Sequence, residues 1–426
     1  MTLKFHKIIL ICAYTYLIFQ YFTTSFMDSH EEIDIVYIYR IPGNLKKISK
    51  QLRMFRNNYT QINFNYTRPM RFSTDLKFIL KWTEAFSHYS SSVFKNGQQA
   101  FIEQNCSYYN CYLTNDKSLI SDPTQFDAIL FDVENNWDSF PLIRISFQKY
   151  IFTASESASN YPICPPHFDD FYNYTWSYRL DSDIRWSYIT ILDTKGNFVG
   201  PKVNMTWINP MLPTSNSVKE KLKTKKKTAA WFVSNCQSQS KRENVTNHLN
   251  IALKKYDLKV DIYGWCGKLT CPRDRLDDCL ELLQDHYYFY LAFENSLSED
   301  YVTEKILYPM QHYTVPIVYG GANYSRFLPP GSYINAREHD VETIAKIMVK
   351  AIQEPKVYEE YFRWHNHYVY KETPEVADVC TLCELLNDPK RNQSVVKNFR
   401  KWWNPNYEKL CGDDLKHMQQ LNKFTL

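Results

Sequence analysis

At 426 residues, the chain has room for two or three domains of ordinary size. It carries 50 Lys and Arg against 46 Asp and Glu, and this balance excludes the strong positive charge typical of nucleic-acid-binding proteins. The aromatic content is high, with 33 Tyr, 26 Phe and 10 Trp, which indicates a large buried core and also suits sugar-binding surfaces.

The N-terminus contains a candidate membrane anchor. Residues 8–27 carry no charge, and about 20 residues is the length that crosses a bilayer as a helix. Lys4 and Lys7 precede this run, so the positive-inside rule places residues 1–7 in the cytosol; the run is followed by Asp28, Glu31, Glu32 and Asp34. A cleaved signal peptide is the alternative, but no small-residue cleavage site follows the apolar run. We therefore expect an uncleaved anchor and a lumenal remainder.

Acceptor sequons for N-linked glycans agree with a lumenal chain, because only the lumenal side offers this modification. They lie at Asn58, Asn65, Asn105, Asn173, Asn204, Asn244, Asn323 and Asn392. Each is a predicted glycosylation site in the orientation inferred above.

The cysteines also fit an oxidising compartment. Without Cys12, which lies inside the anchor, the 11 cysteines become an even number, and we expect disulfides. Their spacing offers local partners, namely Cys106 with Cys111, pairs within Cys266, Cys271 and Cys279, and Cys380 with Cys383. The Cys380-Thr-Leu-Cys383 run also has zinc or redox spacing, but a single C-x-x-C lacks four zinc ligands, so a structural disulfide is favoured.

Between the anchor and residue 216 we expect a stem and a first α/β domain. Residues 28–74 are polar and form the predicted stem. Residues 75–216 form the first domain, in which short apolar runs predict buried strands at 77–82, 128–131 and 150–152. The basic run 217–228 is predicted to be a solvated linker between domains.

The second half, residues 229–383, alternates more regularly between strand and helix patterns. Strands are predicted at 229–234, 260–263, 287–293 and 315–319, and helices at 276–284, at 301–311 and from Lys241 and Arg242 onward. Such alternation predicts a parallel sheet covered by helices. Two domains of this kind imply a cleft between two Rossmann-like folds, with residues 384–426 as a C-terminal tail.

The segment 293–305 holds the strongest candidate site. The predicted strand ends in polar residues at the edge where α/β folds bind ligands, namely Glu294, Asn295 and Ser296. A few residues later, the spacing i, i+3, i+4 predicts one helix face formed by Tyr301, Glu304 and Lys305. A carboxylate, an amide, a phenol and an ammonium together suit a phosphorylated sugar. A capped, salt-bridged surface helix is the alternative for the segment by itself.

If the ligand is a nucleotide sugar, the leaving diphosphate needs positive charge and the attacking hydroxyl needs a base. Lys305 is one candidate cation, and Arg242 is the second because it opens a helix whose N-terminal amides also favour anions. Glu156 follows the predicted strand 150–152 of the other domain, so it is the candidate base. A solvated surface position is the alternative for Arg242 and for Glu156 when each is taken alone.

Asp181 and Asp183 form an Asp-x-Asp pair, which can hold a divalent cation against a diphosphate. The pair lies far in sequence from Arg242 and Lys305, so a capping or domain-packing role is favoured over a metal site.

Several motifs carry a family resemblance. Phe293-Glu-Asn-Ser296 is followed by Asp300-Tyr-Val-Thr-Glu-Lys305, and further motifs within residues 76–383 include Val260-Asp-Ile-Tyr-Gly264, Val315-Pro-Ile-Val-Tyr-Gly320, Phe327-Leu-Pro-Pro-Gly-Ser-Tyr-Ile334, Tyr361-Phe-Arg-Trp364, Phe152–Ser157 and Trp176–Ile184. This combination resembles the signature of the α1,3-fucosyltransferases, glycosyltransferase family ten. The chain departs from the family pattern at Ala158, where many relatives have proline, and at Pro309 inside the signature helix.

The resemblance implies a two-domain fold of the GT-B type and inverting transfer of L-fucose from GDP-fucose to O3 of N-acetylglucosamine. It implies that Glu156 is the general base and that Arg242 and Lys305 grip the diphosphate. On this resemblance, residues 75–216 would bind the acceptor and residues 229–383 would bind GDP-fucose. The nucleotide and fucose pocket would then be lined by Asn295, Tyr301 and Glu304. It also implies that no metal is required, although divalent cations stimulate some members.

Together with the anchor, the resemblance implies a single-pass type II Golgi membrane protein whose catalytic domain is lumenal. Its implied partners are GDP-fucose, glycoprotein N-glycans and the membrane, with no nucleic acid. The acceptor sugar, in the N-glycan core or on an antenna, stays open. The alternatives are a non-catalytic glycan-binding protein on the same fold and an enzyme that uses another nucleotide sugar.

Overall fold

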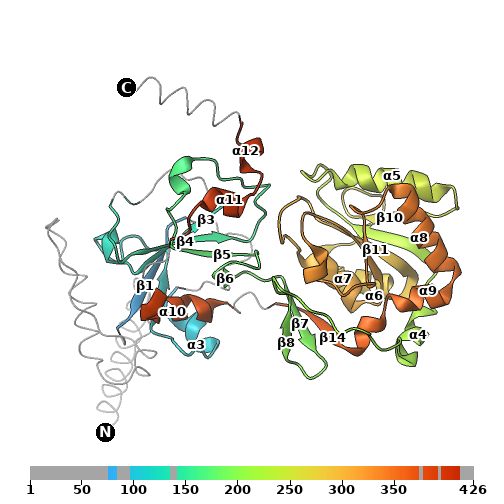
Figure 1. The fold of residues 1–426 in the computed structure, drawn as a ribbon, viewed down its shortest axis with the longest axis horizontal. Helices are drawn as coiled ribbons and strands as arrows, with labels where there is room; N and C mark the ends of the chain where they lie inside the picture. Colours follow the sequence, from blue (N-terminus) through green and yellow to red (C-terminus); the bar gives the residue numbers. More distant parts are fainter. Residues whose placement is uncertain are drawn as a thin grey trace, which may run out of the picture.

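The chain forms two parallel α/β domains and a small antiparallel sheet (Figure 1). The computed structural model describes residues 75–83, 96–134, 141, 143–373, 378–391 and 395–412. The predicted anchor (8–27) and stem (28–74) lie outside these residues. Within the described part of the chain, no helix has the length and apolar character needed to cross a membrane. The prediction of an α/β fold with parallel sheets is confirmed.

The first domain is built on a six-stranded parallel sheet in the order β2-β1-β3-β4-β5-β6. Its strands are β1 (Lys77–Lys81), β2 (Cys111–Thr114), β3 (Ala128–Asp132), β4 (Lys149–Ala154), β5 (Tyr174–Ser177) and β6 (Ile184–Arg185). The apolar runs predicted near residues 80, 130 and 150 are all strands, because this sheet is buried on both faces.

Helices from distant parts of the sequence cover the two faces of the first sheet. Ile79 belongs to the face that packs against α3 (Gln99–Glu103) and α10 (Val379–Asn387). Leu80, the next residue, belongs to the opposite face, which packs against α11 (Phe399–Trp403). Successive strand residues point to opposite faces, so one apolar run serves both layers.

The second domain is built on a five-stranded parallel sheet in the order β10-β9-β11-β12-β13. Its strands are β9 (Lys227–Phe232), β10 (Val260–Tyr263), β11 (Tyr287–Phe293), β12 (Val315–Tyr319) and β13 (Ile334–Asn335). One face is covered by α5 (Arg242–Lys254), α8 (Val341–Gln353) and α9 (Pro355–Glu360), and the other by α6 (Leu276–His286) and α7 (Leu307–Gln311) (Figure 1). The strand–helix alternation predicted for this half is confirmed.

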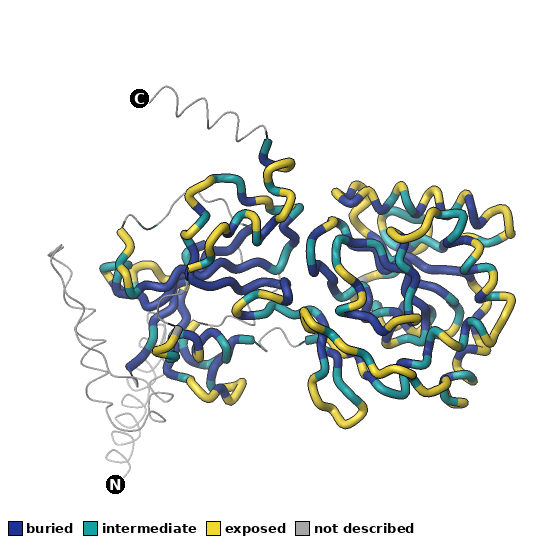
Figure 2. Tube along the Cα trace, in the orientation of Figure 1, coloured by how far each residue is buried: buried dark blue, intermediate teal, exposed yellow. Residues whose placement is uncertain are grey.

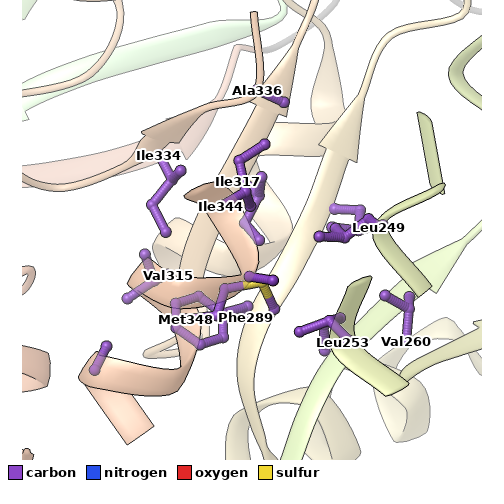
Figure 3. Close-up of a cluster of buried hydrophobic side chains, with 14 of the residues drawn as sticks. Leu249, Leu253, Val260, Phe289, Val315, Ile317, Ile334, Ala336, Ile344 and Met348 are labelled. Atoms are coloured by element: carbon purple, nitrogen blue, oxygen red, sulfur yellow. The ribbon is translucent and has the colours of Figure 1, made fainter. Parts of the chain in front are cut away.

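The core between the second sheet and its α5–α8 layer shows how the sequence pattern specifies the packing (Figure 3). Leu249 and Leu253 of α5, and Ile344 and Met348 of α8, recur four residues apart, so each helix turns one apolar stripe toward the sheet. These side chains pack with strand residues that include Val260, Phe289, Val315, Ile317 and Ile334. Burying one such side chain stabilises the fold by about 1.5–3 kcal/mol.

A small antiparallel sheet lies where the chain passes between the domains. Its order is β14-β7-β8, from β7 (Ile189–Asp193), β8 (Phe198–Gly200) and β14 (Tyr368–Glu372). Ile191 and Tyr370 join the core on the α6–α7 side of the second sheet. The chain leaves the first domain through β7 and returns to it after β14. The pairing of these two strands therefore holds the two interdomain connections together. The strands of both large sheets are buried, with the more exposed segments around them (Figure 2).

The prediction that residues 217–228 form a solvated linker is wrong. The helix α4 (Asn216–Leu222) occupies the first half of this segment, and β9 begins at its end. Val218 and Leu222 lie four residues apart and enter the second core, and Lys225 is only 5 % exposed. The lysine-rich composition concealed an amphipathic helix, because Lys219 follows Val218 and lysines lie on both sides of Leu222 in the sequence.

Two other predicted domain limits also differ from the structure. Residues 189–200, assigned to the first domain, form strands that pack on the second. Residues 379–383, assigned to the second domain, and part of the predicted tail from 384 onward pack on the first. Each domain is therefore completed by a segment that the sequence placed in the other half or left unassigned.

Every cysteine among the described residues forms a disulfide, as expected from the even count. The pairs are Cys106–Cys380, Cys111–Cys383, Cys164–Cys411, Cys236–Cys266 and Cys271–Cys279. The predicted local pairs Cys106–Cys111 and Cys380–Cys383 are wrong. The helix α10 docks beside α3 and β2, which brings its two cysteines to partners more than 270 residues away in sequence.

Candidate active site

The loops after β9 and β11 lie where the strand order of the second sheet reverses. β9 has β10 on one side and β11 on the other. The connection after β9 therefore runs toward one edge of the sheet, and the connection after β11 runs toward the other. Open parallel sheets bind ligands at this point, outside the carboxyl ends of the strands. The loop 233–241 and the segment 294–303 are therefore placed to form a binding site.

Lys305 is held among acidic and hydroxyl groups. Its Nζ donates to Thr303 Oγ1 at 2.6 Å and to Glu304 Oε1 at 3.0 Å, and forms an ion pair with Glu294 Oε2 at 3.2 Å. Burial alone would lower the pKa of Lys305, but the carboxylates of Glu294 and Glu304 outweigh burial and raise that pKa. Lys305 is thus a fixed cation, which is the property that a phosphate-binding residue needs.

Glu294 fixes this segment from the inside. Its side chain is fully buried, and its carboxylate accepts hydrogen bonds from Thr303 N at 2.9 Å and Thr303 Oγ1 at 3.0 Å. At Gly321, after β12, an added Cβ would lie 2.4 Å from Ser298 N, so only glycine permits this close approach. The segment after β11 is therefore anchored both to its own helix start and to the neighbouring strand end.

Arg242 is the first residue of α5, as predicted, but it is buried rather than solvated, with an exposure of 4 %. Its Nη1 donates to Phe293 O at 2.5 Å and its Nη2 to Asn235 O at 3.5 Å, whereas Nε has no partner among the described residues. Burial lowers the pKa of Arg242. The guanidinium thus joins the ends of β9 and β11 and adds a second positive charge beneath the site.

Asn295 and Glu304 each have a side-chain oxygen that is available to accept a hydrogen bond from a ligand. The Oδ1 of Asn295 is buried without a partner among the described residues, although its backbone oxygen accepts from Ser240 N at 2.9 Å. A buried acceptor without a partner is costly, so Asn295 Oδ1 is a good candidate for a ligand contact. The Glu304 side chain is 38 % exposed, and so one of its oxygens remains accessible beside Lys305.

Glu156 lies in the loop after β4 and reaches the second domain. Its Oε2 accepts a hydrogen bond from the Tyr301 hydroxyl at 3.1 Å and a longer one from Asn160 Nδ2 at 3.4 Å. Glu156 is half-buried. The structure therefore brings this residue to the segment that carries Glu304 and Lys305, although the two are far apart in sequence.

Tyr301 does not share a helix face with Glu304 and Lys305, so this prediction is wrong. The chain turns at Asp300, where φ is 55°, and the helical turn starts only at Glu304. Tyr301 is 2 % exposed, its ring packs edge-on against Tyr178 at 5.0 Å, and it belongs to the first domain's core. The segment thus inserts an aromatic side chain into the opposite domain.

Paired serines join the two loops, a contact that was not predicted from the sequence. Ser296 Oγ donates to Ser157 Oγ at 2.5 Å, and Ser159 N donates to Ser298 Oγ at 3.0 Å. Both loops carry a Ser-x-Ser spacing, which was the available signal. These contacts align the Glu156 loop with the segment after β11.

Asp181 and Asp183 are both engaged by protein groups. Asp181 forms a two-point ion pair with Arg179 at 2.9 and 3.0 Å and accepts from Trp402 Nε1 at 3.2 Å. Asp183 Oδ2 accepts from Thr175 N at 2.9 Å and Thr175 Oγ1 at 3.0 Å. These contacts fit the packing role favoured for the pair.

The predicted glycosylation sites divide by exposure. Asn105, Asn204, Asn244 and Asn323 are exposed, whereas Asn58, Asn65 and Asn392 lie outside the described residues. Asn173 is buried, and its Oδ1 accepts from Arg144 Nη2 at 2.6 Å and from Tyr150 N at 2.8 Å. A glycan on Asn173 is incompatible with this packing, so that predicted site is wrong for the folded protein.

Comparison with known proteins identifies the family. Residues 74–189 match the family described as "Fucosyltransferase, N-terminal", and residues 222–402 match "Glycosyltransferase family 10 (fucosyltransferase) C-term". The chain belongs to glycosyltransferase family 10. This family 10 fucosyltransferase is therefore an enzyme of the class that the motifs predicted.

Named relatives agree with this assignment. α-(1,3)-Fucosyltransferase C of Drosophila melanogaster is 37% identical over 347 residues, which cover 78% of this chain and 79% of the relative. α-(1,3)-Fucosyltransferase fut-1 of Caenorhabditis elegans is 30% identical over 318 residues, which cover 72% and 67%. A crystal structure of an α1,3-fucosyltransferase with GDP-fucose aligns at a TM-score of 0.45 and 16% identity, over 74% of this chain and 91% of the other.

Proposed function

We propose that this family 10 enzyme transfers L-fucose from GDP-fucose to O3 of an N-acetylglucosamine on glycoprotein glycans. The family and the named relatives support the sugar and the linkage. The observation that carries the proposal is the hydrogen bond from Tyr301 to Glu156, because it joins a carboxylate of one domain to the cationic segment of the other. A base and a leaving-group cation on facing loops are what a single displacement requires.

In the proposed reaction, Glu156 removes the proton from the attacking hydroxyl. Lys305 stabilises the negative charge that develops on the departing diphosphate, and Arg242 adds a second charge at the start of α5. Attack on the side away from the diphosphate inverts the anomeric carbon of fucose. Asn295 and Glu304 bind donor hydroxyl groups, while Tyr301 positions Glu156.

No metal ion is required in this proposal, because Lys305 and Arg242 supply the positive charge that the diphosphate needs. We also propose that the enzyme works as a single-pass type II Golgi membrane protein with its catalytic domains in the lumen. The uncharged run at 8–27, the disulfides and the exposed sequons support this placement.

The activity is tested with GDP-fucose and a panel of defined N-glycans, with and without EDTA, followed by linkage analysis of the products. We expect fucose on O3 of either the core or an antennal N-acetylglucosamine, with the chelator leaving the rate unchanged. Glycan binding without consumption of GDP-fucose would instead identify a non-catalytic protein. Turnover of a different nucleotide sugar would overturn the donor.

The base is tested with Glu156→Gln, which we expect to lower turnover about 100- to 10,000-fold while GDP still binds. Glu220→Gln is the matched control, because the Glu220 side chain is 68% exposed and its ion pair among the described residues is with Lys223. Near-normal turnover of Glu156→Gln would show that another group is the base.

A further inference from the structure

A cavity of about 530 Å³ lies outside the candidate active site. It is formed by three segments: residues 205–211 between β8 and α4, residues 330–332 before β13, and residues 360, 361, 363 and 364 at the end of α9 and just after it. None of these residues belongs to the loops that hold Glu156, Arg242 or Lys305. Its volume falls within the range of about 300–1,000 Å³ that is typical of small-ligand sites.

Three aromatic residues line the cavity, and Trp207 among them is held in place. Trp207 donates its Nε1 proton to Ser325 O at 2.7 Å and packs edge-on against Tyr368 at 5.0 Å. Tyr361 and Trp364 contribute further aromatic surface. Sugars bind to such surfaces because the C–H face of a pyranose ring packs on an aromatic ring while its hydroxyls meet polar groups at the edge.

Polar groups border the same cavity. Arg363 donates through Nη2 to Met211 O and through Nη1 to Glu360 Oε2 at 3.2 Å, so both charged side chains are positioned before any ligand arrives. Ser332 lines the cavity as well. A few fixed polar groups around apolar walls are the usual composition of a small-molecule site, and pre-positioning them reduces the cost of binding.

A glycosylation sequon forms part of this cavity. In Asn204-Met-Thr206, the second and third residues line the cavity, and Asn204, which directly precedes them in the chain, is exposed. The neighbours of the other exposed sequons, Asn105, Asn244 and Asn323, do not line it. Ile208, a lining residue, is 50 % exposed and is left for a ligand to cover.

We propose that this cavity seats the first sugar residues of an N-linked glycan carried by Asn204. In the modification, Asn204 Nδ2 bonds to the anomeric carbon of a lipid-linked oligosaccharide and releases one proton to water. The bond from that carbon to the lipid diphosphate breaks, and the diphosphate leaves with the electron pair. A tethered ligand has a high effective concentration, so weak stacking is enough to hold it. The seated glycan fastens the segment 205–211 to the second domain.

The test compares glycosylation variants of the full chain produced in insect cells. Asn204→Gln and Thr206→Ala both remove the sequon, Thr206→Ser keeps it, and Asn105→Gln and Asn323→Gln remove glycans elsewhere. Peptide mass spectrometry measures occupancy, and hydrogen exchange measures protection of residues 205–211 and 330–332. We expect faster exchange in both segments and a loss of about 2–4 °C in Tm for Asn204→Gln and Thr206→Ala only.

Trimming the glycan to its first N-acetylglucosamine with an endoglycosidase should preserve most of the protection, since that sugar occupies the cavity. Fucosyl transfer by Asn204→Gln should stay within about twofold of wild type, which separates this proposal from the proposed catalytic function. An unmodified Asn204 in the full chain purified from these cells would overturn the proposal. Unchanged exchange in Asn204→Gln, or equal changes in the Asn105 and Asn323 variants, would overturn it too.

Discussion

The two large domains share a strand order, but their candidate site residues follow different strands of that order. The order β2-β1-β3 in the first sheet repeats the order β10-β9-β11 in the second. In the second domain, Arg242 and Lys305 follow the two strands at the point of reversal, where ligand binding is expected. In the first domain, Glu156 follows β4, which lies beyond that point. The shared topology therefore locates the donor side of the proposed site but not the base.

The domains also differ in how they are completed. The second domain forms its core from nearby segments, and its disulfides span 30 and 8 residues. The first domain needs α10 and α11 from the end of the chain, and its disulfides span 247 to 274 residues. The alternation of strands and helices in the second domain could therefore be predicted from its own sequence. The first domain could not be predicted in this way, because helices that follow the second domain in the chain complete it.

The largest effect is expected at the buried ion pair of the second domain. Lys305→Ala leaves the carboxylate of Glu294 buried and unpaired, so the free energy of unfolding should fall by about 3–5 kcal/mol. The loss of the cation should also abolish measurable transfer. Urea denaturation and single-turnover kinetics measure the two effects.

Two controls separate stability from chemistry in that experiment. Lys223→Ala removes the exposed partner of Glu220, and it should change stability by less than about 0.5 kcal/mol. The double variant Lys305→Met with Glu294→Gln should recover stability and stay inactive. Recovery of activity in the double variant would show that Lys305 has no role in binding the diphosphate.

The next effect tests the long-range disulfides of the first domain. Replacing Cys111 and Cys383 by serine should cost about 2–5 kcal/mol, because the bond closes a very long loop in the unfolded chain. Replacing Cys271 and Cys279, only 8 residues apart, should cost roughly half as much. Equal losses in urea denaturation would show that the two domains do not differ in this respect.

A smaller effect is expected at Lys225, in the segment predicted to be a linker. Burial lowers the pKa of Lys225 from 10.5 to about 7 in the folded protein. Between these values the unfolded chain binds more protons, so wild-type stability should rise as pH increases from 7 to 10. Lys225→Met should remove this rise, which is on the order of a few kcal/mol, and should stabilise the protein at pH 7. Thermal unfolding across this pH range measures the difference, and an unchanged slope would contradict it.

The smallest effect sharpens the contact between the domains. Tyr301→Phe removes the hydrogen bond to Glu156, so turnover should fall about five- to tenfold while GDP binding is unchanged. Tyr370→Phe is the control, since within the described part of the chain its buried hydroxyl donates to Phe327 O and contacts none of the proposed site residues. Weakened GDP binding in Tyr301→Phe would instead show that Tyr301 lines the donor pocket, as the family resemblance implies.

The sequence located elements whose signals are local. The strand Tyr287–Phe293 is an unbroken apolar run, and it has those bounds in the structure. Lys305 and Glu156 were chosen from motifs next to strand ends, and the structure brings Glu156 to Tyr301, in the segment that also carries Lys305. The orientation of Tyr301 was not predictable from spacing, because the positive φ at Asp300 delays the helix. The partners of Cys380 and Cys383 depend on where α10 docks, and no local pattern encodes that.

The bonds from Cys106 to Cys380 and from Cys111 to Cys383 also set an order of events during synthesis. A ribosome delivers the residues of the second domain before it delivers α10 and α11. The second domain can therefore finish folding on the nascent chain while the first still exposes unpaired thiols and an uncovered sheet face. The first domain is synthesised first but is completed last. We therefore expect it to depend on folding assistance until α10 and α11 have been synthesised.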